Sequence, residues 1–496
     1  MITNPSIWQK TQVLPQFEPL PHDVHTQVLV VGAGMAGLCT AHALMQRGYG
    51  VVLIDAGEIA HGTTAGTTGK ITLQHGTCYQ NWRTHLGDDT ACALAHANAH
   101  AVRCMRRLAQ KMDCDLSEQP AILYAATKEG ADMLAREREA YETLDIPFTQ
   151  QWPTDAMQWP HKAVLCVPRQ YMFHPLQFVN DLVQQLHDGG VAIHTHTRAL
   201  ELLEDGVRTD RGIVTAEHIV VATHYPFVNV PGFYFIKMEA RRDYAIAFAG
   251  PALGGMFLSA EESGLSLRNV TCEGTRYVLS VGAGHKTGEQ ESDTNAYEEL
   301  LRRTQALFGK IDVAYQWSAQ DCMPFDKRPY IGRLSSTREN AYVITGFQKW
   351  GMAHSALAAE IVADLIEEKE NAHAELYDPA RGIVGALFQK DARKHMADVA
   401  RQAVKGALQL GEREKTALAP GIARIFATEG VRLGVYCDEQ GVLHGVKAVC
   451  PHLGCALSFN PAERTWDCTC HGSRFAIDGT VLEGPAQTDL QTFTLS

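Results

Sequence analysis

The sequence contains no run of about 20 apolar residues, which is the length that a membrane-spanning helix requires. Basic residues gather in no segment and the formal net charge is −12, so a surface for nucleic-acid phosphates is not expected. Residues 1–18 lack the apolar segment behind lysine or arginine that marks a secretion signal. We therefore expect a cytoplasmic protein with no membrane span and no nucleic-acid partner.

The length of 496 residues is too great for one hydrophobic core and predicts two or three domains. Apolar residues make up 45% and charged residues 20% of the chain, which indicates a globular protein. The 13 cysteines are spread along the sequence. In a reducing compartment most of them are expected to be free, buried thiols.

Two segments near the C-terminus combine cysteine with histidine: Cys450 and His452 in the first, Cys468 and His471 in the second. Zinc accepts such ligands, but Cys450 and His452 are closer in sequence than the usual arms of a zinc site. A Rieske 2Fe-2S centre requires two thiolates on one iron and two imidazoles on the other. The spacing therefore favours a Rieske centre over zinc and over unrelated buried cysteines.

Residues 433–490 closely resemble the Rieske domains of the cytochrome bc type. The resemblance implies that the four residues named above are the metal ligands and that Cys455 and Cys470 form a disulfide. It also implies a Pro loop at residues 484–486 and a small all-β domain.

The reduction potential of the cluster depends on two residues, Ser473 and Phe475, that follow the last ligand in sequence. Ser473 matches a hydroxyl that hydrogen-bonds the cluster in high-potential members of the resembled family, whereas Phe475 stands where those members carry tyrosine. The resemblance thus implies that one hydrogen-bond donor is missing. Fewer hydrogen bonds to sulfur predict a lower potential than that of respiratory Rieske centres.

Residues 27–55 have the pattern of a strand, a glycine-rich turn, a helix and a second strand that ends in an acid. Gly32 permits a tight turn, Gly34 lets backbone amides approach a pyrophosphate, and Gly37 lets the helix pack closely on the strand. Asp55 is placed to bind a ribose hydroxyl. The pattern predicts dinucleotide binding, but the motif alone does not choose between FAD and NAD.

Three later features favour FAD. A loop rich in glycine and hydroxyl groups, residues 62–70, suits a long extended cofactor. Residues 175–197 and 216–226 predict a helix and strands that would complete an interrupted FAD domain, and residues 341–366 predict a strand, a glycine loop and a helix. The candidate contacts in the two loops are Thr63, Thr64, Thr68, Gly346, Lys349, Trp350, Gly351 and Met352.

Together these features resemble the D-amino-acid oxidase and sarcosine oxidase superfamily of FAD-dependent oxidoreductases over residues 25–370. The resemblance implies an α/β fold in which an interrupted Rossmann-like FAD-binding domain holds an inserted mixed-sheet (α+β) substrate domain. It also implies that the last helix points its positive N-terminus at the flavin. The expected domains are FAD-binding at 1–80, 165–226 and 321–370, substrate at 81–164 and 227–320, a helical linker at 371–415, and Rieske at 416–496.

Candidate substrate contacts come from the resemblance, because the family often holds a substrate carboxylate with an arginine and a tyrosine from one strand. Arg241 and Tyr244 lie on such a predicted strand, and a solvated arginine pair at 241 and 242 is the plain alternative. Lys349, at the start of the last helix, is a third candidate catalytic residue.

Two further features have a functional and a plain interpretation. Cys322 lies near the place of a flavin-linked cysteine in sarcosine oxidases, and a free buried cysteine is the alternative. His96 and His100 are one helical turn apart and suit a metal, but no third ligand is in register. We therefore expect these two histidines to be a surface pair.

A flavin takes two electrons and a Rieske cluster passes one at a time, so a chain with both cofactors is expected to convert between the two. The resemblance implies a dehydrogenase that acts on a CH–NH bond of a small amine or amino acid and passes electrons to an external protein or quinone. No second glycine motif for NAD(P)H is present.

Two alternatives stay open: an electron-transfer or redox-sensing protein, and an oxidase that uses O2 beside a structural cluster. A Rieske oxygenase is excluded because no spacing for a mononuclear iron is visible.

Overall fold

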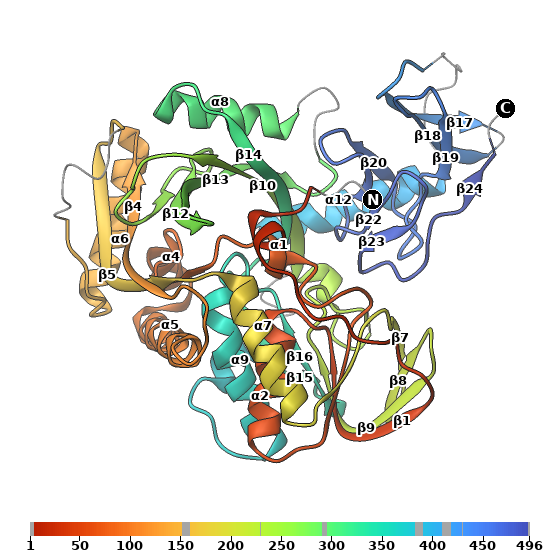
Figure 1. Ribbon diagram of the computed structural model, residues 1–496, viewed down its shortest axis with the longest axis horizontal. Helices are drawn as coiled ribbons and strands as arrows, with labels where there is room; N and C mark the ends of the chain where they lie inside the picture. The colour runs from red at the N-terminus through yellow and green to blue at the C-terminus, as the bar shows by residue number, and fades with distance from the viewer. Residues whose placement is uncertain are drawn as a thin grey trace.

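The computed structural model describes residues 4–150, 159–228, 230–289, 295–381, 390–408, 418–428 and 430–494. Within these ranges the chain forms two large mixed sheets and a C-terminal module that contains two four-stranded sheets (Figure 1). No helix of the described chain is both long enough and apolar enough to cross a bilayer.

The first sheet is built on the predicted strand–turn–helix–strand unit. It consists of β1 (Val24–Val31), β2 (Val51–Ile54), β6 (Ala192–His194), β7 (Ala199–Leu202), β8 (Gly206–Thr209), β9 (Ile213–Val221), β15 (Tyr330–Ser335) and β16 (Arg338–Thr345). The order is β15-β16-β9-β1-β2-β6, and β7 and β8 extend it from β9. Strands β1, β2, β6, β9 and β16 run parallel. β1 and β2 are apolar because helices and loops bury both faces.

One face of this sheet is covered by α2 (Met35–Gln46), α7 (Pro175–Asp188) and α9 (Gly351–Ile366), which lie side by side (Figure 1). Their apolar residues and those of the strands form the largest hydrophobic core. The packing holds α2 and α9 so that both helices begin at the same edge of the sheet, beyond the carboxyl ends of the parallel strands. Ligands of such α/β sheets bind at this edge.

The second sheet is the inserted one. Its strands, in the order β14-β10-β13-β12-β11-β4-β5-β3, are β3 (Lys70–Ile71), β4 (Ser117–Ala125), β5 (Ala163–Met172), β10 (Met238–Ala249), β11 (Met256–Ser259), β12 (Ser266–Cys272), β13 (Thr275–Lys286) and β14 (Val313–Pro324). Four helices accompany it: α4 (Cys78–Leu86), α5 (Asp88–Ala109), α6 (Lys128–Thr143) and α8 (Ala296–Phe308).

The second sheet corrects two of the predicted domain boundaries. β5 continues past residue 165 and β14 past residue 321, because each strand stays hydrogen-bonded to the inserted sheet to its end. The boundaries therefore lie near residues 172 and 324. The predicted start of the last domain, at 416, lies outside the described residues.

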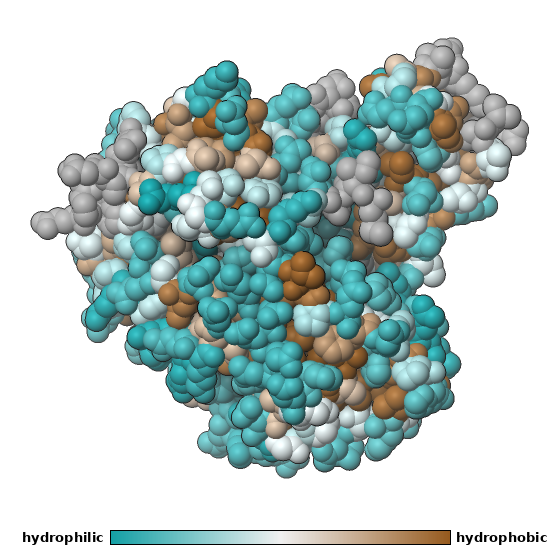
Figure 2. All heavy atoms as spheres, in the orientation of Figure 1, coloured by the Kyte–Doolittle hydropathy of each residue, from teal (hydrophilic) through white to brown (hydrophobic). Residues whose placement is uncertain are grey.

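The C-terminal module follows α12 (Lys390–Ala407) and forms a separate lobe in the space-filling view (Figure 2). One sheet contains β17 (Ala423–Thr428), β18 (Val431–Cys437), β19 (Leu443–Lys447) and β24 (Thr492–Phe493), and the other β20 (Leu457–Asn460), β21 (Thr465–Cys468), β22 (Arg474–Phe475) and β23 (Val481–Glu483). Short elements elsewhere are α1 (Ile7–Thr11), α3 (Thr63–Gly66), α10 (Ala374–Tyr377) and a 3-10 helix (Tyr234–Ile236).

Candidate cofactor sites

The glycine turn between β1 and α2 has space for no side chain at two positions. Gly32 has a φ of +110°, and a β-carbon there would lie 2.5 Å from the carbonyl oxygen of Ala222. A β-carbon at Gly37 would lie 1.8 Å from the carbonyl oxygen of Gly32. Glycine at these positions lets the turn close and α2 pack against it, as the sequence predicts.

The turn is fixed by two side chains from later in the chain. The Thr64 hydroxyl accepts a hydrogen bond from the Met35 N–H at the start of α2, at 3.0 Å. The Asp55 carboxylate accepts one from the Ala33 N–H at 2.7 Å and one from the Gly57 N–H at 2.8 Å. Asp55 therefore organises the turn as well as facing the cavity described next, where it was predicted to bind a ribose.

A cavity of about 1280 Å³ extends from this turn to the start of α9. It is larger than the roughly 300 to 1,000 Å³ of ordinary small-molecule pockets. Its wall combines glycine backbone, threonine hydroxyls and the amides of two helix N-termini, which is a lining that fits the pyrophosphate and ring systems of FAD. The predicted cofactor contacts that line it are Gly32, Gly34, Asp55, Thr63, Thr64, Thr68, Gly346, Lys349, Trp350, Gly351 and Met352, and Gly37 alone among the predicted set packs behind it.

The far end of the cavity is formed by the N-terminus of α9. No side chain caps this helix, so its first amides face the cavity. The Trp350 ring stacks on His75 with centroids 4.3 Å apart, which fixes the entry to the helix. Lys349 forms an ion pair with Asp243 from β10. A positive helix end here stabilises negative charge on a bound group.

Strand β10 divides the predicted substrate contacts between its two faces. Arg241 and Asp243 line the cavity, and the Arg241 guanidinium also pairs with Glu262 at 3.0 Å. Tyr244 is fully buried on the other face, where its hydroxyl lies 3.1 Å from His285 Nε2. The prediction that Tyr244 contacts substrate with Arg241 is therefore wrong, because successive side chains of a strand point to opposite faces.

The sequence reasoning missed Asp321, which lies on β14 directly opposite Arg241 and lines the cavity. Burial raises the pKa of its carboxyl to about 7, and the repulsion of Asp243 acts in the same direction. The next residue, Cys322, faces away from the cavity into a hydrophobic core, so it matches the free-thiol interpretation. The sequence did contain a signal for Asp321. Successive residues of a strand face opposite sides, so a buried Cys322 places Asp321 on the opposite face.

The four predicted metal ligands come together in the C-terminal module as two like pairs. The thiols of Cys450 and Cys468 share a hydrogen bond. The rings of His452 and His471 are 5.1 Å apart and nearly perpendicular. Both nitrogens of His471 are buried without a hydrogen-bond partner of good geometry in the described chain. Two adjacent thiols beside two adjacent imidazoles fit the donor set of a Rieske centre.

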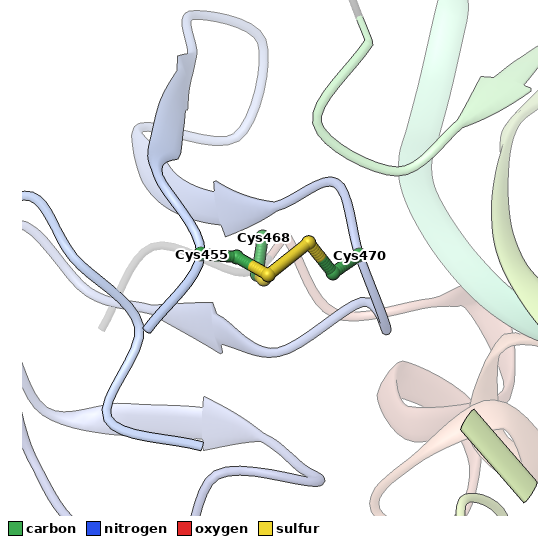
Figure 3. Close-up of side chains that lie close together, drawn as sticks. All are labelled: Cys455, Cys468 and Cys470. Carbon is green, nitrogen blue, oxygen red and sulfur yellow. A yellow bond between two sulfur atoms is a disulfide. The ribbon is translucent and has the colours of Figure 1, made fainter. Parts of the chain in front are cut away.

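Three cysteine sulfurs lie close together at this site (Figure 3). Cys455 and Cys470 form a disulfide that links the two ligand loops, with Cα atoms 6.6 Å apart. Cys468 lies beside this bond but keeps a free thiol. The disulfide therefore joins the non-ligand cysteines and leaves Cys450 and Cys468 available for iron.

The two histidines differ in their surroundings. His471 is 1% exposed, and its ring lies about 6 Å from the rings of Tyr225 and Phe235 of the preceding domains and of His395 of α12. His452 is only half-buried and is followed by Leu453, which is 44% exposed. One imidazole thus faces the body of the protein, and the other lies at the surface.

The Phe475→Tyr variant is expected to raise the reduction potential of the cluster. Phe475 is fully buried in the module, and tyrosine would restore the missing hydrogen-bond donor beside the ligands. A net hydrogen bond of about 1 kcal/mol corresponds to about 40 mV for one electron. Redox titration followed by EPR measures the shift. Phe426→Tyr, in a different core of the same module, is the control, and equal potentials for both variants would contradict the assignment.

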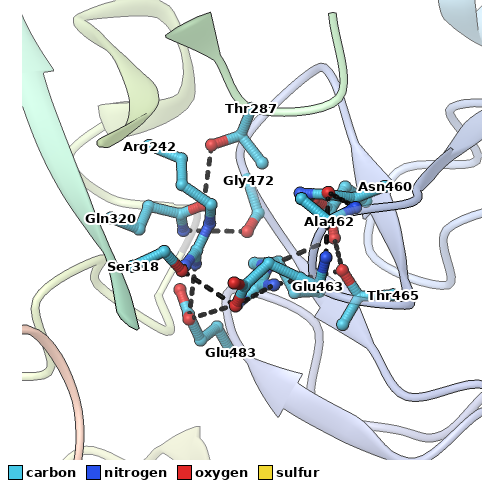
Figure 4. Close-up of polar contacts among 12 residues, drawn as sticks. Arg242, Thr287, Ser318, Gln320, Asn460, Ala462, Glu463, Thr465, Gly472 and Glu483 are labelled. Atoms are coloured by element: carbon cyan, nitrogen blue, oxygen red, sulfur yellow. Dashed lines mark hydrogen bonds and ion pairs between the residues drawn. The ribbon is translucent and has the colours of Figure 1, made fainter. Parts of the chain in front are cut away.

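Buried charges dock the C-terminal module on the inserted sheet (Figure 4). Arg242 of β10 is 1% exposed and donates to Glu483 of β23 at 2.6 Å, and Arg474 of β22 donates to the same carboxylate at 2.8 Å. Burial opposes ionisation of Glu483, but the two guanidinium groups outweigh it and lower its pKa to about 2. The shared carboxylate is therefore ionised at any physiological pH.

Further hydrogen bonds extend this interface. Glu463 accepts hydrogen bonds from Tyr297 at 2.6 Å and Ser318 at 2.8 Å, and Asn460 donates to Tyr244 at 3.1 Å. Tyr244, which was predicted to bind substrate, is therefore a docking residue.

The docked module also closes the cavity. Residues 480–487, which include the predicted Pro loop, form part of the cavity wall. Gln320 lines the cavity and donates to the carbonyl of Gly472 at 2.9 Å, next to the ligand His471. A β-carbon at Gly472 would lie 2.3 Å from Ala240, so the ligand loop approaches β10 closely. The two cofactor sites thus share a wall.

Comparison with protein families agrees with both sites. A family model described as FAD dependent oxidoreductase matches residues 27–365, and a model of the Rieske [2Fe-2S] domain matches residues 412–494. The Bacillus subtilis protein YhfW, named as a Rieske 2Fe-2S iron-sulfur protein, is 35% identical over 98% of this chain and 97% of its own length.

Solved structures share the first two domains. Glycine oxidase from Geobacillus kaustophilus superposes with a TM-score of 0.60 at 19% identity, over 73% of this chain and 100% of that one. L-proline dehydrogenase from P. horikoshii gives 0.62 at 18% identity, over 73% and 98%. These likenesses show the fold. The predicted fold class and the FAD and Rieske 2Fe-2S cofactors are confirmed.

Proposed function

Because the chain belongs to the FAD-dependent oxidoreductase family and carries a C-terminal Rieske [2Fe-2S] domain, we propose that it is an amine or amino-acid dehydrogenase. It would oxidise a CH–NH bond and pass the electrons to an external acceptor. When bound, FAD accepts two electrons from a substrate, and a Rieske cluster transfers electrons singly. The observation that carries the proposal is the shared wall between the two sites.

The substrate class is supported by charged groups at the α9 end of the cavity. Arg241 offers a guanidinium that can bind a carboxylate, and Asp321 and Asp243 offer carboxylates that can bind an amine. Glycine and L-proline, the amino acids named for the two similar solved structures, carry both groups. A small amino acid or a related amine therefore matches the charges of the site.

The route for electrons is supported by the different surroundings of the two histidine ligands. His471 faces the protein body, and its neighbour Gly472 is hydrogen-bonded to Gln320 in the cavity wall. His452 lies at the surface beside exposed Leu453. We assign His471 to the entry side and His452 to the exit side, where a protein or quinone would dock.

An anaerobic experiment tests the function. Purified protein with its FAD and two irons is mixed with glycine, L-proline or other small amines, and flavin absorbance and the Rieske EPR signal are followed together. Loss of flavin absorbance followed by growth of the EPR signal is expected. Flavin that no amine bleaches would indicate an electron-transfer or redox-sensing protein. Peroxide formation at full rate after removal of the cluster would indicate an oxidase with a structural cluster.

Substrate-dependent bleaching is expected to accelerate with rising pH, with an inflection near 7. Asp321, whose pKa is raised to about 7 by burial, is protonated below that pH and can accept a proton from a substrate ammonium above it. Other charges also change the pKa of this carboxyl. It is lowered by Lys349 and Arg242 and raised by Asp243 and Glu483. Stopped-flow bleaching across pH 5.5 to 9 measures the profile.

The Asp321→Asn variant should lose this inflection and bleach about 100-fold more slowly, which is the usual magnitude for one acid–base group. Glu262→Gln, which changes an exposed carboxylate at the cavity edge, is the matched control and should keep the inflection. A pH profile that is the same in the Asp321→Asn variant and the wild type would remove Asp321 from proton transfer.

A further inference from the structure

Three metal-binding side chains meet where α5 packs against α9. His100 Nε2, Cys104 Sγ and Glu360 Oε2 form a triangle in which each pair of atoms is 3.3 Å apart. His100 and Cys104 are on α5 and Glu360 is on α9. All three residues are half-buried, and the Glu360 side chain is 41% exposed.

The spacing of the residues explains why they meet. His100 and Cys104 are four residues apart on α5 and so lie on one helical face. The packing of α5 against α9 brings Glu360 to that face from 256 residues away. From the sequence, His100 was considered together with His96, and no third ligand was in register. In the structure the neighbours of His100 are Cys104 and Glu360.

We propose that His100, Cys104 and Glu360 bind one zinc ion, or a similar borderline-soft divalent metal. Nitrogen, sulfur and carboxylate oxygen are all zinc ligands, and bonds of 2.0 to 2.3 Å in a tetrahedron place the ligand atoms about 3.3 to 3.6 Å apart. The observed triangle therefore has the size of one face of a zinc tetrahedron. The ring of His373 lies 5.1 Å from that of His100 and can supply the fourth ligand, or water can.

The charges of these ligands match those of a zinc ion. Zinc would displace the thiol proton to solvent, and the resulting thiolate and the Glu360 carboxylate together neutralise the two charges of the ion. Burial and the adjacent carboxylate raise the pKa of the Cys104 thiol to about 12, so without a cation the thiol keeps its proton and donates it to Glu360. Arg103 and Arg107 lower the pKa of the thiol, but neither forms an ion pair with Glu360 in the described chain.

A metal here would connect the inserted domain to the FAD-binding domain. α9 begins at the cavity with Gly351, and Glu360 lies in the second half of the same helix. Zinc would therefore hold the position of α9 relative to α5 without taking part in the redox chemistry. The inference goes beyond the proposed function and does not depend on it.

The test uses the full-length protein with FAD and cluster bound. After chelator treatment and addition of one equivalent of ZnCl2, dialysis followed by elemental analysis should give one zinc per chain while two irons are retained. Iodoacetamide labelling of Cys104, read by mass spectrometry, should slow at least 10-fold with zinc. The Cys104→Ser and Glu360→Gln variants should bind zinc at least 10-fold more weakly. Cys92→Ser, a half-buried thiol on the same helix, is the control and should bind normally.

Each outcome decides the proposal. Absence of zinc after dialysis of the wild type would overturn it. Zinc that is retained equally by Cys104→Ser and Cys92→Ser would also overturn it, because the ion would then lie elsewhere. Circular dichroism and iron content establish that each variant is folded, and the labelling of Cys104 in the wild type gives an answer even where a variant does not fold.

Discussion

The Cys468→Ser variant is expected to lose the Rieske EPR signal and at least 100-fold of its rate with a one-electron acceptor, while amines still bleach its flavin. Cys468 is 1% exposed and its thiol is paired with that of Cys450, so serine would leave one iron with a single thiolate instead of two. The cavity that binds FAD is formed mainly by the first two domains, so the oxidation half of the reaction should continue. Iron content, EPR and acceptor reduction measure the outcome.

Cys437→Ser is the matched control for this prediction. Cys437 is a buried free cysteine in the same module, on β18, and it is not among the four ligands. This variant should retain two irons and the wild-type rate. If Cys468→Ser lost its iron but reduced the acceptor at the wild-type rate, the cluster would be structural and electrons would leave the flavin directly.

The parts of the molecule that could be predicted from the sequence are those encoded by neighbouring residues. Gly32, Gly34 and Gly37 indicate the turn because each spacing has a steric reason within one strand–helix unit. Cys450, His452, Cys468 and His471 indicate the cluster because two short loops carry complete ligand pairs. The start of α9 at Gly351 follows from a glycine loop before an apolar helix. In these cases local chemistry determines the structure.

The parts that could not be predicted depend on which face of an element meets a distant one. Tyr244 was named as a substrate contact because the resembled family often uses an arginine and a tyrosine of one strand, but here the tyrosine faces the docked module. Asp321 faces the cavity only because β14 pairs with β10 in the observed register. His100 meets Glu360 across 260 residues. Single-sequence patterns specify the alternation of a strand but not the partner on each face.

The docking of the C-terminal module is the most consequential of these long-range features. Its ligand loop touches β10 through Gly472, and its residues 480–487 form part of the wall of the FAD cavity. A module held by buried charges keeps the His471 side of the cluster against the cavity wall. This arrangement suits repeated transfer between two fixed sites, and it makes the charged contact at Arg242 critical.

The Arg242→Met variant is therefore expected to destabilise the docked module by about 1.5 to 3 kcal/mol, which is typical for the loss of a hydrogen bond between charged groups. Arg242 is 1% exposed, and its loss would leave Glu483 with Arg474 as its remaining guanidinium partner in the described interface. Urea denaturation followed by the visible circular dichroism of the cluster measures the change. The rate of EPR signal growth after flavin bleaching should fall in the same variant, because the wall between the two sites would open.

Arg302→Met provides the control, since Arg302 forms an exposed ion pair with Glu299 on α8, and such pairs contribute only about 0 to 1 kcal/mol. A second variant, Arg242→Met combined with Glu483→Gln, removes both charges and should recover little of the lost stability, because Arg474 already neutralises Glu483 in the single variant. If Arg242→Met denatured at the same urea concentration as Arg302→Met, the ion pair would contribute nothing to docking. The shared wall would then depend on other contacts, such as the hydrogen bonds of Asn460, Glu463 and Gly472.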